Sequence, residues 1–383
     1  MQLTPRQYLM QFGNLLQGTL FGALEKSLGA LSEQAQLLVS VLTLVSPGAA
    51  LLQGRWPGRP AKHRAALASA FVAKAIYGFS TTRQLLERLP SDPQLLKLCG
   101  WNSARQRPHE STFSRAFEEF AHSELPQRLH AAVIQKTQHA RLIGHIARDA
   151  TAIEAREKFP EPKPKKAKYQ RRPKRAKASE RGTRLDQQRQ QPLARQLSEL
   201  SRQCSIGVKK NSQGHEHYWR GYKLHLDVAD GQIPISALLT GASVHDSQAA
   251  IPLMTMTGAR VSYLYDLMDA AYDAAAIHNH SRALGHAPIV DRNFRADHEG
   301  KAERGREVER LKLIHMPDFD DLIYDFRTMA ERVNARLKDE FGARFLRVRG
   351  ALKVKCHLMF GIVALAVDQI IRVVDLQGRP RLT

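Results

Sequence analysis

Four polar residues in the stretch YDFRTMAERVNARLK recur at a spacing that would place them on one side of a helix. They are Tyr324, Arg327, Glu331 and Lys338, and at about 100° per residue they fall within an arc of about 60°. The opposite side predicts a buried apolar stripe, made of Leu322, Phe326, Met329, Val333 and Leu337. On this pattern alone, a row with a chemical task and a solvated face with an Arg327–Glu331 ion pair are equally good interpretations.

Two aspartates upstream lie on predicted strands and could join Glu331 in a set of three carboxylates. Asp149 lies in the run RLIGHIARDATAIE, and Asp269 follows the run VSYLYDLM. Clustered Asp and Glu oxygens suit Mg²⁺ or Mn²⁺, and two such ions can act on the attacking and leaving oxygens of a phosphoryl displacement. Left without metal, the like charges would repel one another. Spacing alone does not choose Asp269 over Asp266 and Asp273.

The order of the predicted elements after residue 140 is the one that would bring these carboxylates together. The strand containing Asp149 is followed by YWRGYKLHLDVAD and QIPISALLTGASV, two strand-like runs joined by the hairpin signal Asp230-Gly231. Helices over 246–258 and 274–285 then alternate with strands over 261–268 and 286–291, and the helix over 324–338 comes last. This order, β-β-β-α-β-α-β-α, predicts an α/β fold of the RNase H-like type, with a mixed five-stranded sheet flanked by helices. The sequence lacks GxGxxG and GxxxxGK[ST], which disfavours doubly wound nucleotide-binding folds.

The chain divides into two predicted domains with a basic insertion in the second. Residues 1–140 read as helical throughout, and residues 141–383 form the α/β catalytic domain. An insertion over about 156–203 begins with a Lys-, Arg- and Pro-rich stretch, which predicts an exposed segment without fixed structure. The helices beside Arg-rich loops such as SARQRPH suit a DNA-binding bundle, although a purely structural bundle explains them equally well.

Composition points to a nucleic-acid partner. The 383 residues carry a formal net charge of +21, which favours an extended polyanion. A membrane-surface protein would need a basic amphipathic helix or a lipid signal, and neither is found. The three cysteines form no CxxC pair, and the apolar run over 37–52 is too short for a membrane span, so we expect a cytoplasmic, nucleoid-associated protein.

Six blocks of the sequence resemble, in chain order, those of one large group of bacterial insertion-sequence DDE transposases. YDFRTMAERVNARLK matches the Y-x2-R-x3-E-x6-K signature of that group, and RDATAI is similar to its first-aspartate strand. GYKLH, SVHDS, DAAYDA and the closing LRVRGALKVKCHLMFGIVALAV also look like its blocks, so that the resemblance covers about 141–370. The 331 − 269 = 62 residues between the last two carboxylates leave no room for a large inserted β-domain.

The resemblance implies a function and a set of site residues. Asp149, Asp269 and Glu331 would be the catalytic, metal-holding triad for two Mg²⁺ or Mn²⁺ ions, while Tyr324, Arg327 and Lys338 would contact transposon-end DNA. The helical region would bind the element's ends, and the enzyme would cleave them and join their 3′-OH groups to target DNA, as a homodimer in the synapse. A catalytically inactive DNA-binding relic and a structure-specific nuclease are the alternatives.

Other residues that could do chemistry have plainer explanations. His215-Glu216-His217 fits a polar loop better than a metal pair, because no further ligand follows at a set spacing. Trp219 and Tyr222 are expected to pack in the core rather than to stack on bases. We expect Asp246 or Ser247 to cap the helix over 246–258.

Overall fold

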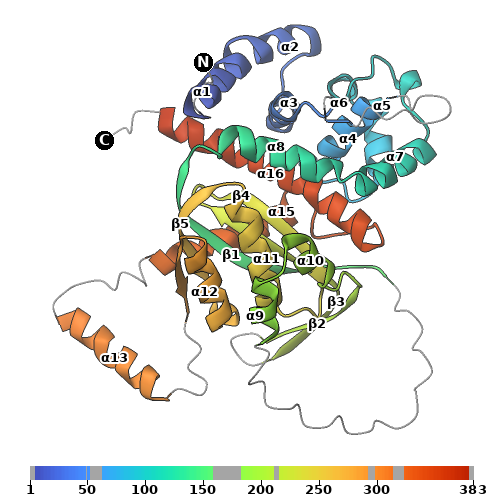
Figure 1. Cartoon of the computed structure of the whole chain (residues 1–383). Helices are drawn as coiled ribbons and strands as arrows, with labels where there is room; N and C mark the ends of the chain where they lie inside the picture. Colours follow the sequence, from blue (N-terminus) through green and yellow to red (C-terminus); the bar gives the residue numbers. More distant parts are fainter. Residues whose placement is uncertain are drawn as a thin grey trace, which may run out of the picture.

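The structure is a computed structural model that describes residues 5–48, 50–51, 63–157, 183–210, 215–291, 298–313 and 323–378. It contains a mixed α/β region with a helical region before it (Figure 1). The sheet is formed by β1 (Leu142–Glu154), β2 (Ser205–Lys210), β3 (Glu216–Ala229), β4 (Ile233–Gly241), β5 (Ser262–Met268) and β6 (Ala287–Val290).

The sheet is mixed, as predicted, but it has six strands rather than five. Its order is β2-β3-β1-β5-β6, with β4 also paired to β3. β1 runs antiparallel to β3 and parallel to β5, and β5 is parallel to β6. The strand missed by sequence reasoning is β2, which pairs with residues 216–221 of β3, whereas β4 pairs with residues 222–229. The five predicted strands are all present.

Part of the predicted basic insertion has regular structure. Residues 158–182 lie outside the described residues, so the expectation for that stretch remains a prediction. Residues 183–203, however, include the helices α9 (Arg184–Arg189) and α10 (Leu193–Ser198), which contradicts an insertion without structure up to residue 203. Thr183 and Asp186 form a capping box that begins α9, and Gln188 of α9 donates to the Gln248 carbonyl at 3.0 Å.

Helices lie on both faces of the sheet. α11 (Asp246–Gly258) and α12 (Ala275–Ala283) pack on one face with α9 and α10. α15 (Thr328–Asp339) contacts β1 and β3 on the other face. Adjacent β1 residues prove the division, because Arg148 belongs to a network that reaches α11 while Asp149 bonds to α15. α11 is capped by His245, which accepts from the Ser247 N–H, so the predicted caps Asp246 and Ser247 are wrong by one or two residues.

The helix predicted over 324–338 is broken near its start. A 3₁₀ turn, η4 (Asp325–Arg327), precedes α15, and it changes the phase of the residues before Thr328. Phe326 is therefore 48% exposed instead of buried, and its ring stacks on His145 with centroids 4.9 Å apart. Met329, Val333 and Leu337 are buried as predicted.

The helical region before the sheet runs from residue 5 to residue 137 in the described parts of the chain. Asp92 and Pro93 begin α6 and Gly100 ends it, because Asp92 accepts from the Leu95 N–H and Gly100 adopts a left-handed conformation. The helical elements are α1 (Pro5–Leu15), η1 (Leu16–Leu20), α2 (Phe21–Leu28), α3 (Glu33–Val45), α4 (Arg64–Ile76), α5 (Thr82–Ser91), α6 (Pro93–Cys99), η2 (Ala104–Gln106), α7 (Glu110–His122) and α8 (Leu125–Thr137).

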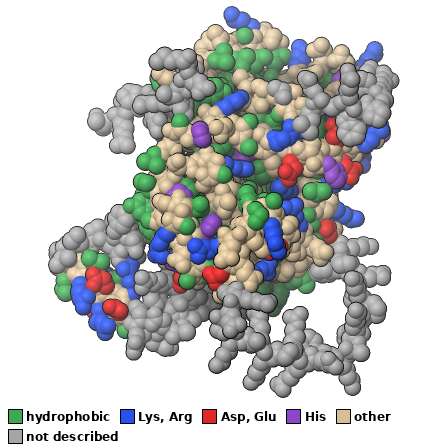
Figure 2. All heavy atoms as spheres, viewed as in Figure 1, with side chains coloured by type: hydrophobic (Ala, Val, Ile, Leu, Met, Phe, Trp, Pro, Cys, Tyr) green, Lys and Arg blue, Asp and Glu red, His purple; other side chains and the backbone are tan. Residues whose placement is uncertain are grey.

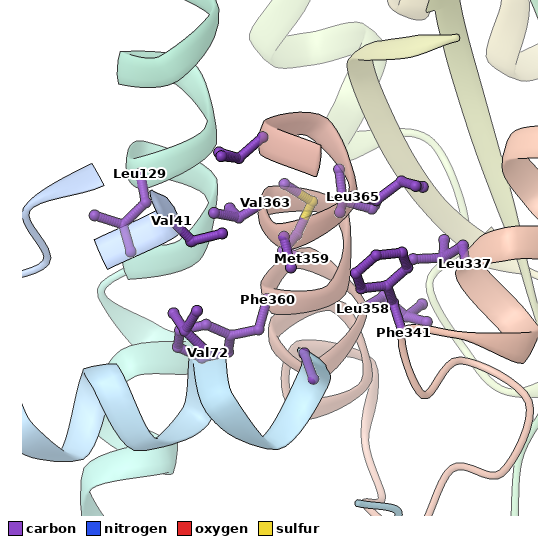
Figure 3. Packing of buried hydrophobic residues seen from close by; sticks show 14 of the residues in the cluster. Val41, Val72, Leu129, Leu337, Phe341, Leu358, Met359, Phe360, Val363 and Leu365 are labelled. Carbon is purple, nitrogen blue, oxygen red and sulfur yellow. The ribbon is translucent and has the colours of Figure 1, made fainter. Parts of the chain in front are cut away.

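The long helix α16 (Ala351–Gly378) joins the helical region to the sheet. It packs against α3, α4, α7 and α8, and also against β4 and α15. Figure 3 shows Phe360 and Val363 of α16 directed toward Val72 and Val41, while Leu337 and Phe341 lie on its other side. One cluster of buried apolar side chains thus extends across the boundary predicted near residue 140, which stays a prediction.

α16 also bears on the expected absence of a membrane span. Residues 351–373 are long and apolar enough to cross a bilayer by composition, but most of this stretch is buried inside the protein. This stretch differs from the apolar run over 37–52 that was considered from the sequence.

Between α12 and α15, the described helix α13 (His298–Leu313) follows β6.

Candidate active site at the ends of the central strands

Asp149 and Asp269 lie side by side because their strands are paired in parallel. Ala147 of β1 is level with Leu267 of β5, and the same register continued by two residues brings Asp149 level with Asp269. The pKa of Asp149 is raised to about 6, and burial is the main cause. Asp269 also raises this pKa, while the hydrogen bond from the Ala150 N–H and other groups lower it. The two carboxylates therefore interact electrostatically.

Asp269 ends its strand and caps the next turn. Its Oδ1 accepts a hydrogen bond at 3.0 Å from the N–H of Ala271, at the start of η3 (Ala270–Tyr272). Burial raises the pKa of Asp269, with a contribution from Asp246, while Arg327 and Lys209 act in the opposite direction.

The two neighbours that could have replaced Asp269 have other partners. Asp266 is fully buried and pairs with Arg148 at 3.2 Å on the α11 face of the sheet. Asp273 pairs with His278 at 3.1 Å. Of the three aspartates that spacing left open, the structure brings Asp269 beside Asp149.

Glu331 lies on α15, the helix that packs against the strand of Asp149, but its side chain pairs with Arg327 and not with a metal-binding group. Its Oε1 is 2.8 Å from the guanidinium of Arg327, and its side chain is 54% exposed. Within the described parts of the chain, no group of three His, Cys, Asp or Glu side chains is close enough to hold a metal ion. The structure thus brings two of the three predicted carboxylates together and leaves the third paired with a cation.

Arg327 is central to the electrostatics of the site. Its guanidinium lies 5.3 Å from the centre of the Tyr324 ring, and its charge lowers the pKa of both Asp149 and Asp269. Its side chain is only 17% exposed. Tyr324, Arg327 and Lys338 of the polar row are partly buried and Glu331 is exposed, so the row is not a fully solvated face, although the Arg327–Glu331 ion pair of that interpretation is present.

Cations gather at the other end of the same row. Burial lowers the pKa of Lys338, and the nearby cations Arg344 and Lys209 lower it further, while Glu154 and Asp149 act in the opposite direction. Arg344 comes from the segment after α15, and Lys209 from β2. Lys338 therefore lies near the Asp149 and Glu154 carboxylates and also near other positive charges, a set that suits a polyanion.

Sequence reasoning missed Asn334, which contacts Asp149 directly. Asn334 is 5% exposed, and its Nδ2 donates a hydrogen bond to the Asp149 Oδ2 at 2.9 Å. Helical spacing contains the signal, because Asn334 follows Glu331 by three residues and precedes Lys338 by four, filling the gap in the row.

A buried ion network beneath the site was also missed. Arg148 is fully buried between β3 and β5, 2.8 Å from Asp227 and 3.2 Å from Asp266. The hydroxyls of Thr257 and Ser281 donate to Asp227 and Asp266, each at 2.6 Å. Removing one partner from such a network costs about 3–5 kcal/mol, because it leaves an uncompensated buried charge. The network ties together the strands that carry Asp149 and Asp269.

An ion pair between Lys223 and Asp246 lies near Asp269. Lys223 donates to Asp246 at 2.9 Å and to the Val244 carbonyl at 3.0 Å, joining β3 to the start of α11. Trp219 and Tyr222 of the same strand are buried, as predicted. GYKLH and SVHDS, two of the sequence blocks singled out above, therefore meet in this pair.

Comparison with known proteins agrees with this geometry. A family model described as "Transposase DDE domain" matches residues 141–367, and one described as "Transposase domain (DUF772)" matches residues 28–119. Neither the curated proteins nor the solved structures contain a match to the chain. The first match covers the sheet, both carboxylate-bearing strands, α15 and most of α16, and the arrangement is consistent with an RNase H-like fold. The chain belongs to the DDE transposase family.

Proposed function

We propose that this transposase binds the ends of an insertion sequence, cleaves them by metal-dependent hydrolysis and joins the 3′-OH ends to target DNA. The observation that carries the proposal is the pair Asp149 and Asp269 at the ends of two parallel strands, with Glu331 on the helix that faces them. Family membership supports action on DNA, and the net charge of +21 suits that partner. Figure 2 shows Lys and Arg side chains scattered over the visible face, among apolar and other polar atoms.

The residues present fit a divalent metal site. Asp149 and Asp269 supply hard oxygen ligands whose mutual repulsion a cation would relieve, and Glu331 would join them after leaving Arg327. When bound, two Mg²⁺ or Mn²⁺ ions supply Lewis-acid stabilisation of charge on the attacking and leaving oxygens.

The chain's own residues bind and orient the DNA. Arg327 and Lys338 contact phosphates of the element's end, and Tyr324 packs beside Arg327 at the same place. We infer that the Arg327 guanidinium moves from Glu331 to a phosphate when an end binds, because this movement frees the Glu331 carboxylate to join the metal site. The helices of residues 1–140 bind the ends, and two copies of the chain form the synapse on nucleoid DNA in the cytoplasm.

The proposed reaction has two displacements at phosphorus. Water attacks the phosphodiester at the element's end, the bond from phosphorus to the 3′ oxygen breaks, and a 3′-OH is released. That 3′-OH then attacks a target phosphodiester, forms a new phosphorus–oxygen bond and displaces the target's 3′ oxygen. Asp149, Asp269 and Glu331 hold the centre at which both occur, in the manner of RNase H-like enzymes.

Substitution of the three carboxylates tests the proposal. Asp149→Asn, Asp269→Asn and Glu331→Gln each remove a ligand charge with little change in shape, and each should abolish cleavage and strand transfer while end binding persists. The substrate is a duplex of the inverted repeat that brackets the gene, assayed by gel shift, cleavage and joining.

Asp273→Asn is the matched control, because Asp273 pairs with His278 rather than with the site, and it should retain activity. Mg²⁺-dependent cleavage by the Asp269→Asn variant would disprove the triad. A wild-type protein that binds ends without cutting them would be a relic, and one that cuts without joining would be a structure-specific nuclease.

A further inference from the structure

Asn334 places a carboxamide between the catalytic helix and Asp149. Its Nδ2 donates to the Asp149 Oδ2 at 2.9 Å, and the side chain is 5% exposed. An ionised carboxylate accepts hydrogen bonds and donates none, so the amide must present its NH₂ group to Asp149. The other amide atom, Oδ1, is buried and has no hydrogen-bond partner among the described residues. The amide NH₂ group of Asn334 therefore has a hydrogen-bond partner in the structure, whereas the amide oxygen beside the site has none among the described residues.

An apolar residue would suit the position better if packing were its only purpose. Ala330, Val333 and Leu337 on the same helix are fully buried, and Leu has the same branched side-chain shape as Asn, with no polar atom. A buried carbonyl oxygen without a partner carries the full cost of its lost hydration, which Leu would avoid. Such an atom calls for an explanation, and a donor that arrives with the substrate supplies one.

The position on α15 supports the same conclusion. Within α15, Glu331, Asn334 and Lys338 follow one another at spacings of three and four residues, which is one continuous stripe of a helix. Asn334 is the member of this stripe whose bond to Asp149 links α15 to β1. It is thus placed to fix the distance between Glu331 and the aspartate on the facing strand.

We propose that Asn334 is a positioning residue of the catalytic centre: its NH₂ group orients the Asp149 carboxylate for metal binding, and its Oδ1 accepts a hydrogen bond from a water or hydroxyl group that enters with the DNA. The proposal rests on the function proposed above. It assigns Asn334 no direct step in the reaction, because it acts through Asp149.

The test measures metal affinity separately from activity. Mn²⁺ binding is followed by electron paramagnetic resonance on the full chain in complex with the end duplex. Asn334→Leu keeps the branched side-chain shape and removes the amide, and it should weaken Mn²⁺ binding about 10–100-fold, the range typical for loss of a partner that orients a metal ligand. The single-turnover cleavage rate should fall by a similar factor and recover partly at high Mn²⁺, while affinity for the end duplex stays within about twofold of wild type.

Asn334→Asp provides an independent readout in the same complex. It sets a second carboxylate against Asp149, so the variant should melt below wild type without metal and gain more from Mn²⁺ than wild type does. A residue that only fills space would show no such metal-dependent gain.

Gln196→Leu is the matched control. Gln196 is another buried amide, 2% exposed, which donates at 3.0 Å to Gln188 and at 2.9 Å to Gln191, while its oxygen lacks a partner among the described residues. Because Gln196 lies in α10, on the other face of the sheet, its loss should lower the melting temperature and leave Mn²⁺ affinity unchanged.

Two results separate this inference from the proposed function. If Asp149→Asn abolishes Mn²⁺ binding but Asn334→Leu binds Mn²⁺ and cleaves like wild type, Asn334 is a packing residue and the inference alone is wrong. If Asp149→Asn also binds Mn²⁺ normally, or if wild type binds none, the proposed metal site is wrong and the inference falls with it.

Discussion

Three buried histidines make the folded protein sensitive to acid. His130, His225 and His357 are each less than a tenth exposed, and burial is the main reason that their pKa values fall to about 3, 4 and 3. Their rings have partners as neutral groups, such as the Pro234 carbonyl, 2.8 Å from the His130 Nε2. Protonation would place a buried charge beside Arg260 at His130 and beside Lys74 at His357, while at His225 the charge would lie near both Asp246 and Lys223.

We predict that the free energy of unfolding decreases as the pH falls from 6 to 4. Below its usual pKa of about 6.5, each histidine takes up a proton in the unfolded state but stays neutral in the folded state, so acid favours unfolding. Asp149 acts in the opposite direction by one proton. Its folded-state pKa is raised to about 6, so it takes up a proton in the folded state at a pH where it is still ionised in the unfolded state. A net uptake of about two protons gives a slope of about 3 kcal/mol per pH unit.

Urea unfolding at pH 5.5 and 4.5, with a chelator present, measures this slope. His130→Gln keeps a donor for the Pro234 carbonyl and should reduce the slope by one proton, about 1.4 kcal/mol per pH unit. An identical slope in the variant would mean that His130 titrates normally in the folded protein.

At the level of single residues, the sequence proposed which residues form the site but few of their contacts. The resemblance of the ordered blocks selected Asp149, Asp269 and Glu331, and helical spacing offered the Arg327–Glu331 ion pair as one of two interpretations, a pair that the structure contains at 2.8 Å. The Asn334–Asp149 bond joins residues 185 positions apart in the chain, and its burial follows from the packing of α15 on β1. Arg148 beside Asp149 could not be recognised as an ion-network centre, because both of its partners come from other strands.

The contact between α15 and α16 depends on one glycine. Gly361 of α16 lies against the end of α15, where a Cβ atom would be 2.8 Å from the Phe341 carbonyl oxygen and 3.1 Å from Leu337. The backbone carbonyl cannot rotate away as a long side chain could. The close approach therefore sets the position of the helix that carries Glu331 and Asn334.

We predict that Gly361→Ala destabilises the protein by about 1–2 kcal/mol. Ala favours a helix interior by up to about 1 kcal/mol over Gly, but overpacking costs about 1–3 kcal/mol, and here the second effect is larger because backbone is the obstacle. The cleavage rate should fall as well, since α15 must shift relative to Asp149. Thermal melting and single-turnover cleavage measure the two effects.

Gly13→Ala is the comparison variant for this substitution. Gly13 lies within α1, and a Cβ there would meet no atom within 4 Å, so the same change should be neutral or stabilising. Equal effects at the two positions would show that helix propensity, not the close approach, decides the outcome.

Elements with their own periodicity were predictable, and elements defined by a partner were not. The strand-like runs that form β1, β3 and β4 were predicted in their order along the chain, and the turn signal at Asp230-Gly231 predicted the hairpin that joins β3 to β4. β2 was missed because SIGVKK has little hydrophobic pattern, and its register comes from pairing with β3. The 3₁₀ turn η4 was missed because Phe326 satisfies a helical pattern in sequence but stacks on His145 in space.

At the scale of the whole molecule, the basic segment over 156–184 has anchored ends. It contains thirteen Lys and Arg against three Glu. At its start, the Glu157 carboxylate accepts from the Tyr222 hydroxyl at 2.6 Å and from the Gly350 N–H at 2.7 Å. At its end, Thr183 caps α9. The segment thus begins a few residues beyond Asp149 and ends at a helix that packs on α11 and α12.

We predict that this segment lies along the DNA backbone and contributes to salt dependence. If four to six of its cations contact phosphates, replacing residues 160–180 by a short Gly-Ser linker should flatten the slope of log K against log salt by about 3.6–5.4 units. Preference for the element's end should persist, because phosphate contacts do not read bases. A salt titration of end binding measures the slope, and an unchanged slope would make the segment a linker without contacts.

The central position of α16 has a consequence for how the protein is made. α8 ends at Thr137 and α16 begins at Ala351, so the ribosome adds 350 − 137 = 213 residues between them. At about 5–20 residues per second, the apolar faces of α3, α4, α7 and α8 wait about 10–40 seconds for the helix that covers them. During translation these faces are candidates for chaperone binding and for aggregation, so the yield of folded enzyme in a cell depends on the rate of synthesis relative to that delay.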